Sequence, residues 1–183
     1  MKKFFALSLF ALVTMLSTTA FAQKPVTVGG APMFPNKNII ENAVNSKDHT
    51  TLVAAVKAAG LVETLQGNGP FTVFAPVNAA FDALPAGTVD TLLKPENKGT
   101  LTSVLTYHVI AARLNSKALE RMIKQGGGRA ILKTVQGSEL TATMNGSDIN
   151  ITDAKGNAAR ITITNVNQSN GVIHVIDRVL LPQ

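Results

Sequence analysis

Cysteine and tryptophan are absent from the 183-residue sequence, and tyrosine occurs once. Without cysteine no disulfide can form, so the fold must be held by its hydrophobic core alone. The shortage of aromatic residues and the lack of a run of basic residues argue against nucleic acid as a partner. Beyond the N-terminal region, no apolar run is long enough to cross a lipid bilayer.

The first 22 residues have the pattern of a secretory signal peptide. Two lysines precede the apolar stretch Phe4–Leu16, and the small-residue motif Ala20-Phe21-Ala22 follows it. We therefore expect residues 1–22 to be a signal peptide that is cleaved after Ala22, which leaves a secreted or periplasmic chain. An uncleaved membrane anchor is the less favoured alternative, because the apolar run is short.

Cleavage at that point would leave 161 residues with 15 basic and 11 acidic side chains, a net charge of +4. This length suits one domain with a sizeable core. Residues 23–37 are rich in proline and glycine and are expected to form an extended leader, laid over the domain or loose. Residues 38–183 are expected to form the domain. The basic residues look evenly spread, which predicts at most weak contact with anionic surfaces.

Hydrophobic periodicity predicts an α+β fold. Helical patterns dominate residues 38–124, interrupted by expected strands at Phe71–Ala75 and Tyr107–Ile110. Period-two alternation follows in four segments: Ile131–Val135, Glu139–Met144, Asp148–Thr152 and Arg160–Val166. Asn145-Gly146, between two of these segments, is the strongest hairpin signal. We expect an antiparallel meander with the helices covering one side of the sheet.

Capping signals set the expected limits of the helices. Asp48, Asn78 and Thr88 each stand before a helical pattern and are expected to cap it. Gly60 stands where a glycine that ends a helix belongs. His49 falls in an expected first helical turn, where we expect it to be solvated.

The segment Gly171–Pro182 is nearly all apolar and rich in β-branched residues. This composition, over a dozen residues, is typical of a strand buried on both faces. The segment also contains His174 and Asp177, and burying a polar group without a partner costs about 1–3 kcal/mol. Whatever bonds to these two side chains is therefore expected to help fix the fold around the strand.

Three segments resemble the conserved motifs of the fasciclin (FAS1) domain family. They are FTVFAPVNAAF at Phe71–Phe81, LTYHVI at Leu105–Ile110 and NGVIHVIDRVLLP at Asn170–Pro182, in the family's order and spacing. The resemblance implies a β-wedge of about seven mostly antiparallel strands with helices packed alongside. It also identifies the structural motif residues Phe74, Ala75, Pro76, Asn78, Phe81, Gly171, His174 and Asp177.

The resemblance further implies adhesion. In animal members, integrin recognition is tied to the Tyr-His motif, which marks Tyr107 and His108 here as candidate binding residues. A core tyrosine with a satisfied hydroxyl is the more common alternative for Tyr107. It is also tied to an aspartate-containing stretch before the last motif, but residues 165–168 contain no acid, which argues against integrin-type recognition. Val77 replaces the usual threonine or serine of the first motif.

Chemistry at His108, His174 and Asp177 is the competing interpretation. The two imidazoles could form a metal or catalytic pair with the carboxylate, but metal sites usually need three or four ligands, and no thiol or neighbouring histidine is available. We therefore favour two buried imidazoles bonded to backbone carbonyls or to a polar side chain such as Asn78. Asp177 is expected to accept hydrogen bonds from buried N–H groups, with Arg178 facing outward. No catalytic residue, metal or cofactor is expected.

The sequence thus predicts a non-catalytic adhesion or interaction module. Its expected partner is a cell-surface or extracellular-matrix protein or polysaccharide, and the protein itself is expected to be a monomer or to self-associate weakly. One alternative is a carrier of a lipid or metabolite in the cell envelope. The less favoured alternative is a metal-dependent hydrolase that uses the two histidines and Asp177.

Overall fold

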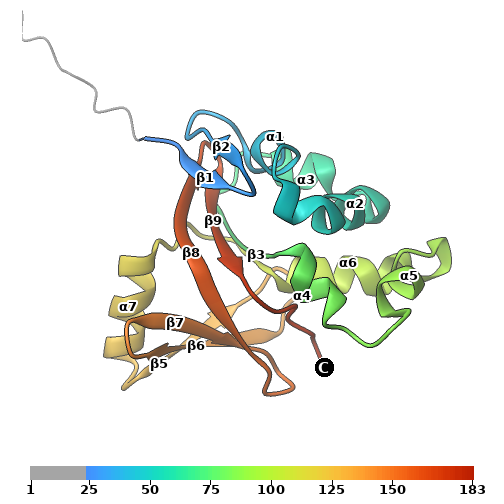
Figure 1. Cartoon of the computed structure of the whole chain (residues 1–183). Coiled ribbons are helices and arrows are strands. Elements are labelled where there is room, and N and C mark those ends of the chain that lie inside the picture. The colour runs from blue at the N-terminus through green and yellow to red at the C-terminus, as the bar shows by residue number, and fades with distance from the viewer. Residues whose placement is uncertain (1–23) are drawn as a thin grey trace, which may run out of the picture.

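The computed structural model describes residues 24–183, in which a strongly bent sheet stands between two groups of helices (Figure 1). The expected signal peptide and its cleavage site lie outside these residues. Within them, no helix is long and apolar enough to span a membrane.

Seven strands form the main sheet, in the order β4-β3-β9-β8-β7-β6-β5. Their bounds are β3 (Phe71–Pro76), β4 (Val109–Ile110), β5 (Arg129–Lys133), β6 (Glu139–Asn145), β7 (Asp148–Thr152), β8 (Ala158–Gln168) and β9 (Gly171–Ile176). All neighbours are antiparallel except β3 and β9. The N–H of Val135 donates to the carbonyl of Val109 across the two edges at 2.8 Å. The expected seven-stranded, mostly antiparallel wedge is therefore confirmed, and the wedge is nearly closed.

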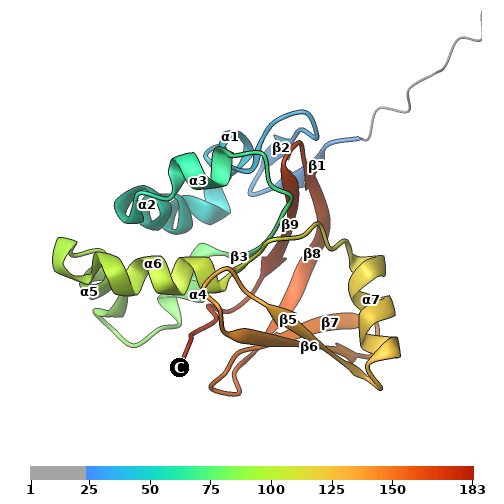
Figure 2. The ribbon, with the colours of Figure 1, turned by 180° about the vertical axis from the view of Figure 1, so that it is seen from behind.

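The helices lie on two sides of this sheet (Figures 1 and 2). They are α1 (Ile39–Ala43), α2 (Thr50–Ala59), α3 (Val62–Gln66), α4 (Asn78–Asp82), α5 (Thr88–Leu92), α6 (Lys98–Tyr107) and α7 (Ser116–Gln125), with short 3-10 turns at Lys47–His49 and Pro95–Asn97. Helices α1 to α6 gather beside β3 and β9, whereas α7 packs against β5 and β6. The expectation that the helices cover one side of the sheet was therefore wrong for α7.

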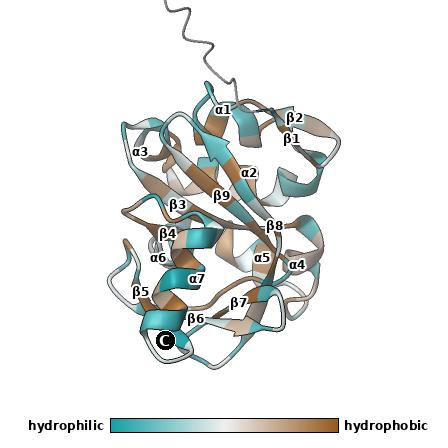
Figure 3. Ribbon diagram, turned by 90° about the vertical axis from the view of Figure 1, so that its left-hand side faces the viewer, coloured by the Kyte–Doolittle hydropathy of each residue, from teal (hydrophilic) through white to brown (hydrophobic). Residues whose placement is uncertain are grey.

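Two hydrophobic cores result from this arrangement. The first core lies between α1–α6 and the sheet, and the second lies between α7 and the meander. Strand β3 separates them, because Val73 and Ala75 point into the first core and Phe74 into the second. Strand β9 does the same with Val175 and Ile176, and all six of its residues are buried. The apolar run along β9 is visible in Figure 3, and the expectation of a strand buried on both faces is confirmed.

Part of the expected leader forms a two-stranded hairpin, β1 (Val26–Val28) and β2 (Ala31–Met33). Val28 and Met33 are buried in the first core. The N–H of Lys47 donates to the carbonyl of Gly29 at 3.2 Å, which fixes the hairpin to the start of the helical layer. The hairpin therefore contributes side chains to the first core.

Several local expectations are confirmed. Gly60 ends α2 in the left-handed conformation at φ +74°, and the N–H of Leu61 donates to the carbonyl of Val56 at 3.0 Å, as in a Schellman motif. The hairpin marked by Asn145-Gly146 joins β6 to β7, with Asn145 opposite Asp148 and the turn at Gly146-Ser147.

Other local expectations were wrong, mostly by a residue or two. Helix α2 begins at Thr50 after a 3-10 turn, so Asp48 does not cap it, and Gly87 rather than Thr88 precedes α5. Tyr107 is the last residue of α6 and His108 follows it, so the strand expected from Tyr107 begins only at Val109. Here the helical hydrogen bonds of α6 extend through Tyr107 and His108, and only the β-branched Val109 and Ile110 form the strand.

Candidate functional site

The three motifs noticed in the sequence meet in the middle of the sheet. Strands β3 and β9 run parallel and pair from Phe71–Gly171 to Pro76–Ile176, and β4 pairs antiparallel with the other edge of β3. Gly171 has a steric role, because a Cβ at this position would collide with the carbonyl oxygen of Phe71. The motifs thus form one continuous joint between the two cores.

His108 connects the end of α6 to the C-terminal segment. Its Nδ1 donates to the carbonyl of Val104 at 2.8 Å, and its Nε2 accepts from the N–H of Leu180 at 3.0 Å. The side chain is almost fully buried, and burial lowers its pKa to about 4, although the Val104 carbonyl and Asp153 act in the opposite direction. The ring is therefore neutral at pH 7 and has both nitrogens engaged.

His174 lies opposite Phe74 in the β3–β9 pair and stacks on its ring, with the centroids 5.9 Å apart. Its Nε2 donates to the carbonyl of Leu114 at 2.8 Å, and burial lowers its pKa. Its Nδ1 faces the N–H of Asn165 at 3.5 Å. The expectation of buried imidazoles bonded to backbone carbonyls is confirmed for both histidines, whereas Asn78 bonds to neither.

Tyr107 has no exposed surface. Its hydroxyl donates to the carbonyl of Glu139 at 2.8 Å and accepts from the N–H of Ala154 at 2.9 Å, which ties α6 to the meander. Burial raises its pKa. Because neither Tyr107 nor His108 reaches the surface, their assignment as binding residues is corrected: both side chains hold the core together.

Asn78 has a different role from the one expected. It is the first residue of α4 and does not cap that helix, because the preceding residue is Val77, which makes no side-chain cap. Its Oδ1 instead accepts from the N–H of Thr51 at 3.1 Å, and its Nδ2 donates to the carbonyl of Lys47 at 2.9 Å. Asn78 thus caps α2, a helix that ends well before it in the chain, while Phe81 anchors α4 in the first core.

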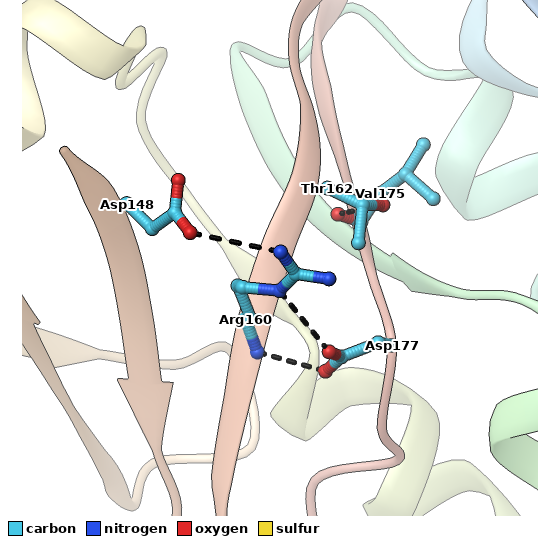
Figure 4. A network of polar contacts seen from close by, with 5 residues as sticks. All are labelled: Asp148, Arg160, Thr162, Val175 and Asp177. Atoms are coloured by element: carbon cyan, nitrogen blue, oxygen red, sulfur yellow. Dashed lines mark hydrogen bonds and ion pairs between the residues drawn. The ribbon is translucent and has the colours of Figure 1, made fainter. Parts of the chain in front are cut away.

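Asp177 lies just past the end of β9 and is exposed (Figure 4). Its Oδ1 accepts from the N–H of Arg160 at 2.8 Å, and its Oδ2 lies 3.5 Å from Nε of the same arginine, which also faces Asp148 at 3.6 Å. The expected acceptor role is thus found on the surface and for one N–H group, not in the interior. Arg178 is exposed, as expected.

The triad of the hydrolase interpretation is not assembled. The imidazoles of His108 and His174 are hydrogen-bonded to backbone groups, and Asp177 pairs with Arg160. Within residues 24–183, no group of three or more His, Cys, Asp or Glu side chains is arranged to hold a metal ion. The metal-dependent hydrolase is therefore not supported by the geometry.

Asp153 was missed by the sequence reasoning. It is buried, with Oδ1 accepting from the N–H groups of Lys155 and Asn157 at 2.9 and 2.8 Å, and Oδ2 accepting from the N–H of Leu181 at 3.0 Å. The local part of this role was readable, because an aspartate before Ala-Lys-Gly favours an Asx turn. The bond to Leu181 was not, since it joins segments 28 residues apart.

Asn170 was recognised only as a turn residue. Its Oδ1 accepts from the N–H of Ile39 at 3.1 Å, and its Nδ2 donates to the carbonyls of Leu65 and Gly67, each at 2.8 Å. Beside it, Asn42 donates to the side-chain oxygen of Gln168. These buried amides fasten α1 and α3 to the β8–β9 turn, a role that no local pattern indicates.

An apolar cavity of about 80 Å³ lies inside the first core. Residues of the β1–β2 hairpin, α1–α3, α6 and the sheet line it, including Met33, Ile39, Leu65 and Phe71. His49 also lines it and is buried, which corrects the expectation that this residue is solvated. Its Nδ1 bonds to the hydroxyl of Ser46 at 2.9 Å.

The second ring nitrogen of His49, Nε2, has no hydrogen-bond partner within residues 24–183. The carbonyl of Ala75 is close enough to favour a protonated ring but makes no hydrogen bond of good geometry. Burial outweighs this effect and lowers the pKa of His49. The mostly apolar wall of the cavity therefore contains the neutral imidazole of His49.

Comparison with known protein families identifies the family to which this architecture belongs. The fasciclin domain model matches residues 47–182, which contain all three motifs, the whole second core and most of the first core. The chain belongs to the fasciclin domain family. The expected family, fold and motif arrangement are therefore confirmed.

Relatives of this fasciclin domain occur in bacteria. It is 42% identical to protein sll1483 of Synechocystis over 98% of this chain and 94% of that one. It is 36% identical to the immunogenic protein MPB70 of Mycobacterium bovis, over 86% of this chain and 74% of the other. It is also 34% identical to the cell surface glycolipoprotein MPB83 of the same species, over 88% and 68%.

Among solved structures, the fasciclin domain resembles a FAS1 domain pair from the insect cell adhesion molecule fasciclin I. The TM-score is 0.71, with 19% sequence identity over 80% of this chain and 51% of that one. At this identity the likeness concerns the fold. The chain spans about half of the domain pair.

Proposed function

We propose that this protein is a non-catalytic interaction module that works outside the cytoplasm and attaches to a protein or polysaccharide of a cell surface or matrix. The observation that carries the proposal is the state of the motif side chains. Tyr107, His108 and His174 are the groups best suited to chemistry, and all three are buried and bonded to the backbone. Such side chains serve the fold, which leaves the outer surface for recognition.

The relatives support this proposal. The fasciclin domain family is generally non-enzymatic, and one relative is described as a cell surface glycolipoprotein. The N-terminal pattern at residues 1–22 supports export, with cleavage after Ala22 as part of the proposal.

A binding experiment on whole cells tests the proposal. The labelled chain from Gln23 to Gln183 should bind saturably to envelope or matrix fractions at physiological salt, and unlabelled protein should compete. A heat-unfolded sample of the same chain has the same net charge but no folded surface, so it should lose this binding. Equal binding by that sample would show attraction by net charge alone, and the lack of saturable binding to any fraction would overturn the proposal.

The apolar cavity favours a second candidate function, the carriage of a small apolar ligand. A dry apolar cavity of about 150 Å³ can bind benzene, so a cavity of about 80 Å³ suits only a small group, such as the end of an acyl chain. Lauric acid is the probe for calorimetric titration. The matched variant is Ala43→Leu, because Ala43 lines the cavity at a half-buried position of α1 and the added atoms narrow it. If the protein carries such a ligand, it should bind lauric acid, and Ala43→Leu should bind it more weakly. Equal binding by both proteins, or no binding by either, contradicts the carrier function.

A further inference from the structure

The net positive charge of the domain is concentrated on one segment, which corrects the expectation that the basic residues are evenly spread. Residues 113–133 contain six basic side chains and one acidic one, a net charge of +5, whereas the rest of residues 24–183 carries nine basic and ten acidic side chains, a net charge of −1. The six basic residues are all exposed: Arg113, Lys117, Arg121, Lys124, Arg129 and Lys133. The positive charge of the domain is therefore local.

Three of these residues form a stripe along α7. Lys117, Arg121 and Lys124 follow one another at intervals of four and three residues, so they share one helix face with steps of about 6 and about 4.5 Å along the axis. The opposite face of α7 contributes Leu119 and Ile123 to the second core. We call the three residues the basic stripe. Together with Asn115 and Glu120 they line a shallow hollow on the surface.

No acid of the described chain neutralises the basic stripe. The ion pairs formed within residues 24–183 both belong to Arg160, and Glu120, although it borders the same hollow, pairs with none of the three. Arg113 differs from the stripe, because its Nη2 donates to the carbonyls of Gln168 and Ser169 at 2.9 and 3.0 Å. Arg113 thus holds the β8–β9 turn, and the stripe is left with its charges facing solvent.

The helix that carries the stripe is fixed at both ends. Asn115 caps it by accepting from the N–H of Ala118 at 2.8 Å, and Asn165 bonds to both the N–H and the hydroxyl of Ser116 at 2.8 Å. At the other end, the N–H of Gly128 donates to the carbonyl of Ile123 at 2.9 Å. A helix held in this way presents its charges at fixed spacing, which lowers the entropic cost of binding a partner.

We propose that the basic stripe is the binding site for an anionic polysaccharide, a chain of sugars carrying carboxylates, laid along the axis of α7. A linear polymer with regularly repeated charges complements a linear row of cations. Glu120 borders the same hollow and opposes the attraction. This inference rests on the proposed function and names the chemical class of its partner.

Two other anionic partners fit the stripe less well. The apolar residues of α7 are committed to the second core, so the helix has no side chain to insert into a membrane, and three basic residues alone give only weak attachment to lipid. Nucleic acid binding commonly adds aromatic stacking, and α7 contains no aromatic residue. The stripe therefore favours a polymer that is read by its charge alone.

Binding of polygalacturonate to the chain from Gln23 to Gln183, measured by calorimetry at low salt, tests the proposal. The triple variant Lys117→Gln, Arg121→Gln, Lys124→Gln should weaken binding by about tenfold or more, because a protein with fewer cations displaces fewer counterions from the polymer. For the same reason, its binding should depend less steeply on salt concentration. The single variant Glu120→Gln should strengthen binding by about twofold.

The matched control is the triple variant Lys94→Gln, Lys98→Gln, Lys155→Gln, which removes the same charge from exposed positions outside the segment. It should bind polygalacturonate within about twofold of the unmodified protein. Neutral dextran should bind to none of the proteins. Thermal unfolding should be the same for both triple variants, since all six side chains are exposed.

Equal weakening in the two triple variants would overturn the proposal, because the effect would then come from net charge. It would also be overturned if vesicles containing phosphatidylglycerol bound through the stripe while polygalacturonate did not bind. A stripe variant that loses polygalacturonate but keeps saturable binding to whole cells would support the site and assign the cell partner to another face. If the unmodified protein shows no saturable binding to cells, that result overturns the proposed function and leaves the polygalacturonate measurement to decide the role of the stripe.

Discussion

The two hydrophobic cores differ in how completely they are packed. Nine of the fifteen buried residues of the second core have no exposed surface, whereas none of the twenty buried residues of the first core is so completely enclosed. The first core also contains the apolar cavity and Nε2 of His49, which has no hydrogen-bond partner in the described part of the chain. The second core is built from a meander whose neighbouring strands follow one another in the chain, and α7 closes it.

The difference in packing suits the two cores to different functions. A loosely packed core with a cavity can take up a small apolar group, and a tightly packed core gives rigid support to whatever lies on its outside. In this protein the tight core lies beneath the basic stripe, and the loose core lies beneath short helices. Recognition of a polymer is thus expected on one side of the sheet, and any uptake of a small ligand on the other.

Removing Tyr107 should break the tight core most severely. Tyr107→Ala leaves a large cavity and strands the carbonyl of Glu139 and the N–H of Ala154, so we expect a loss of about 3–5 kcal/mol in the free energy of unfolding. Tyr107→Phe, the matched variant, keeps the ring and should lose about 1–3 kcal/mol. Urea denaturation followed by circular dichroism measures both. A Tyr107→Ala protein as stable as the unmodified one would return Tyr107 to the list of surface contacts.

Truncating one leucine in each core compares them directly. Leu119 has no exposed surface, whereas Leu65 is 7% exposed and lines the cavity, so it has fewer contacts to lose. We expect Leu119→Ala to cost about 4 kcal/mol and Leu65→Ala about 2 kcal/mol. Equal losses in paired denaturation curves would show that the cores are packed alike.

Acid should destabilise the protein through His108. Burial holds its pKa at about 4 in the folded state, against 6.5 in an unfolded chain, so the unfolded chain binds the proton more readily between these values. The contribution is complete above pH 6.5 and is lost as the pH falls toward 4, by about 3 kcal/mol in total.

Denaturation midpoints at pH 7, 5.5 and 4 would measure this loss. In His108→Gln the midpoint should change less over the same range, although the variant is less stable at pH 7. Carboxylates titrate in both proteins and cancel in the comparison. Identical pH dependence in the two would mean that His108 is not the buried proton acceptor.

A modest effect is expected at His174, on the wall between the cores. His174→Ala removes the partner of the Leu114 carbonyl and the ring stacked on Phe74, and should cost about 1–3 kcal/mol. His174→Gln keeps a donor and should recover part of the loss. A midpoint of His174→Ala within error of the unmodified protein would indicate that the Leu114 carbonyl finds water instead.

Much of the fold could be predicted because its signals are local. The alternation of the meander strands, the glycine that ends α2 and the hairpin at Asn145-Gly146 each depend on a few consecutive residues. The buried nature of β9 followed from its composition in the same way. The strand expected from Tyr107 was wrong because residues of mixed preference took the conformation of the helix that precedes them.

The candidate site could be predicted less well, because its members act across the chain. Asn78 was expected to cap the helix beside it and caps α2 instead, and Tyr107, whose role as a core or a contact residue the sequence left open, bonds to the meander. Which face a side chain points to depends on what packs there, and residue type alone does not decide it. The concentration of charge at residues 113–133 was present in the sequence, but its meaning depends on which helix face is buried.

The sequence by itself determined the family, the seven-stranded wedge and the three motifs, since these follow from short patterns in a fixed order. Only the tertiary structure decided that the motif side chains are buried, that the helices divide between two cores and that three cations of α7 face solvent together. The physical reason is that burial and pairing are properties of contacts between distant segments. Here the parallel pairing of β3 with β9, a hundred residues apart, creates the wall from which both cores are built.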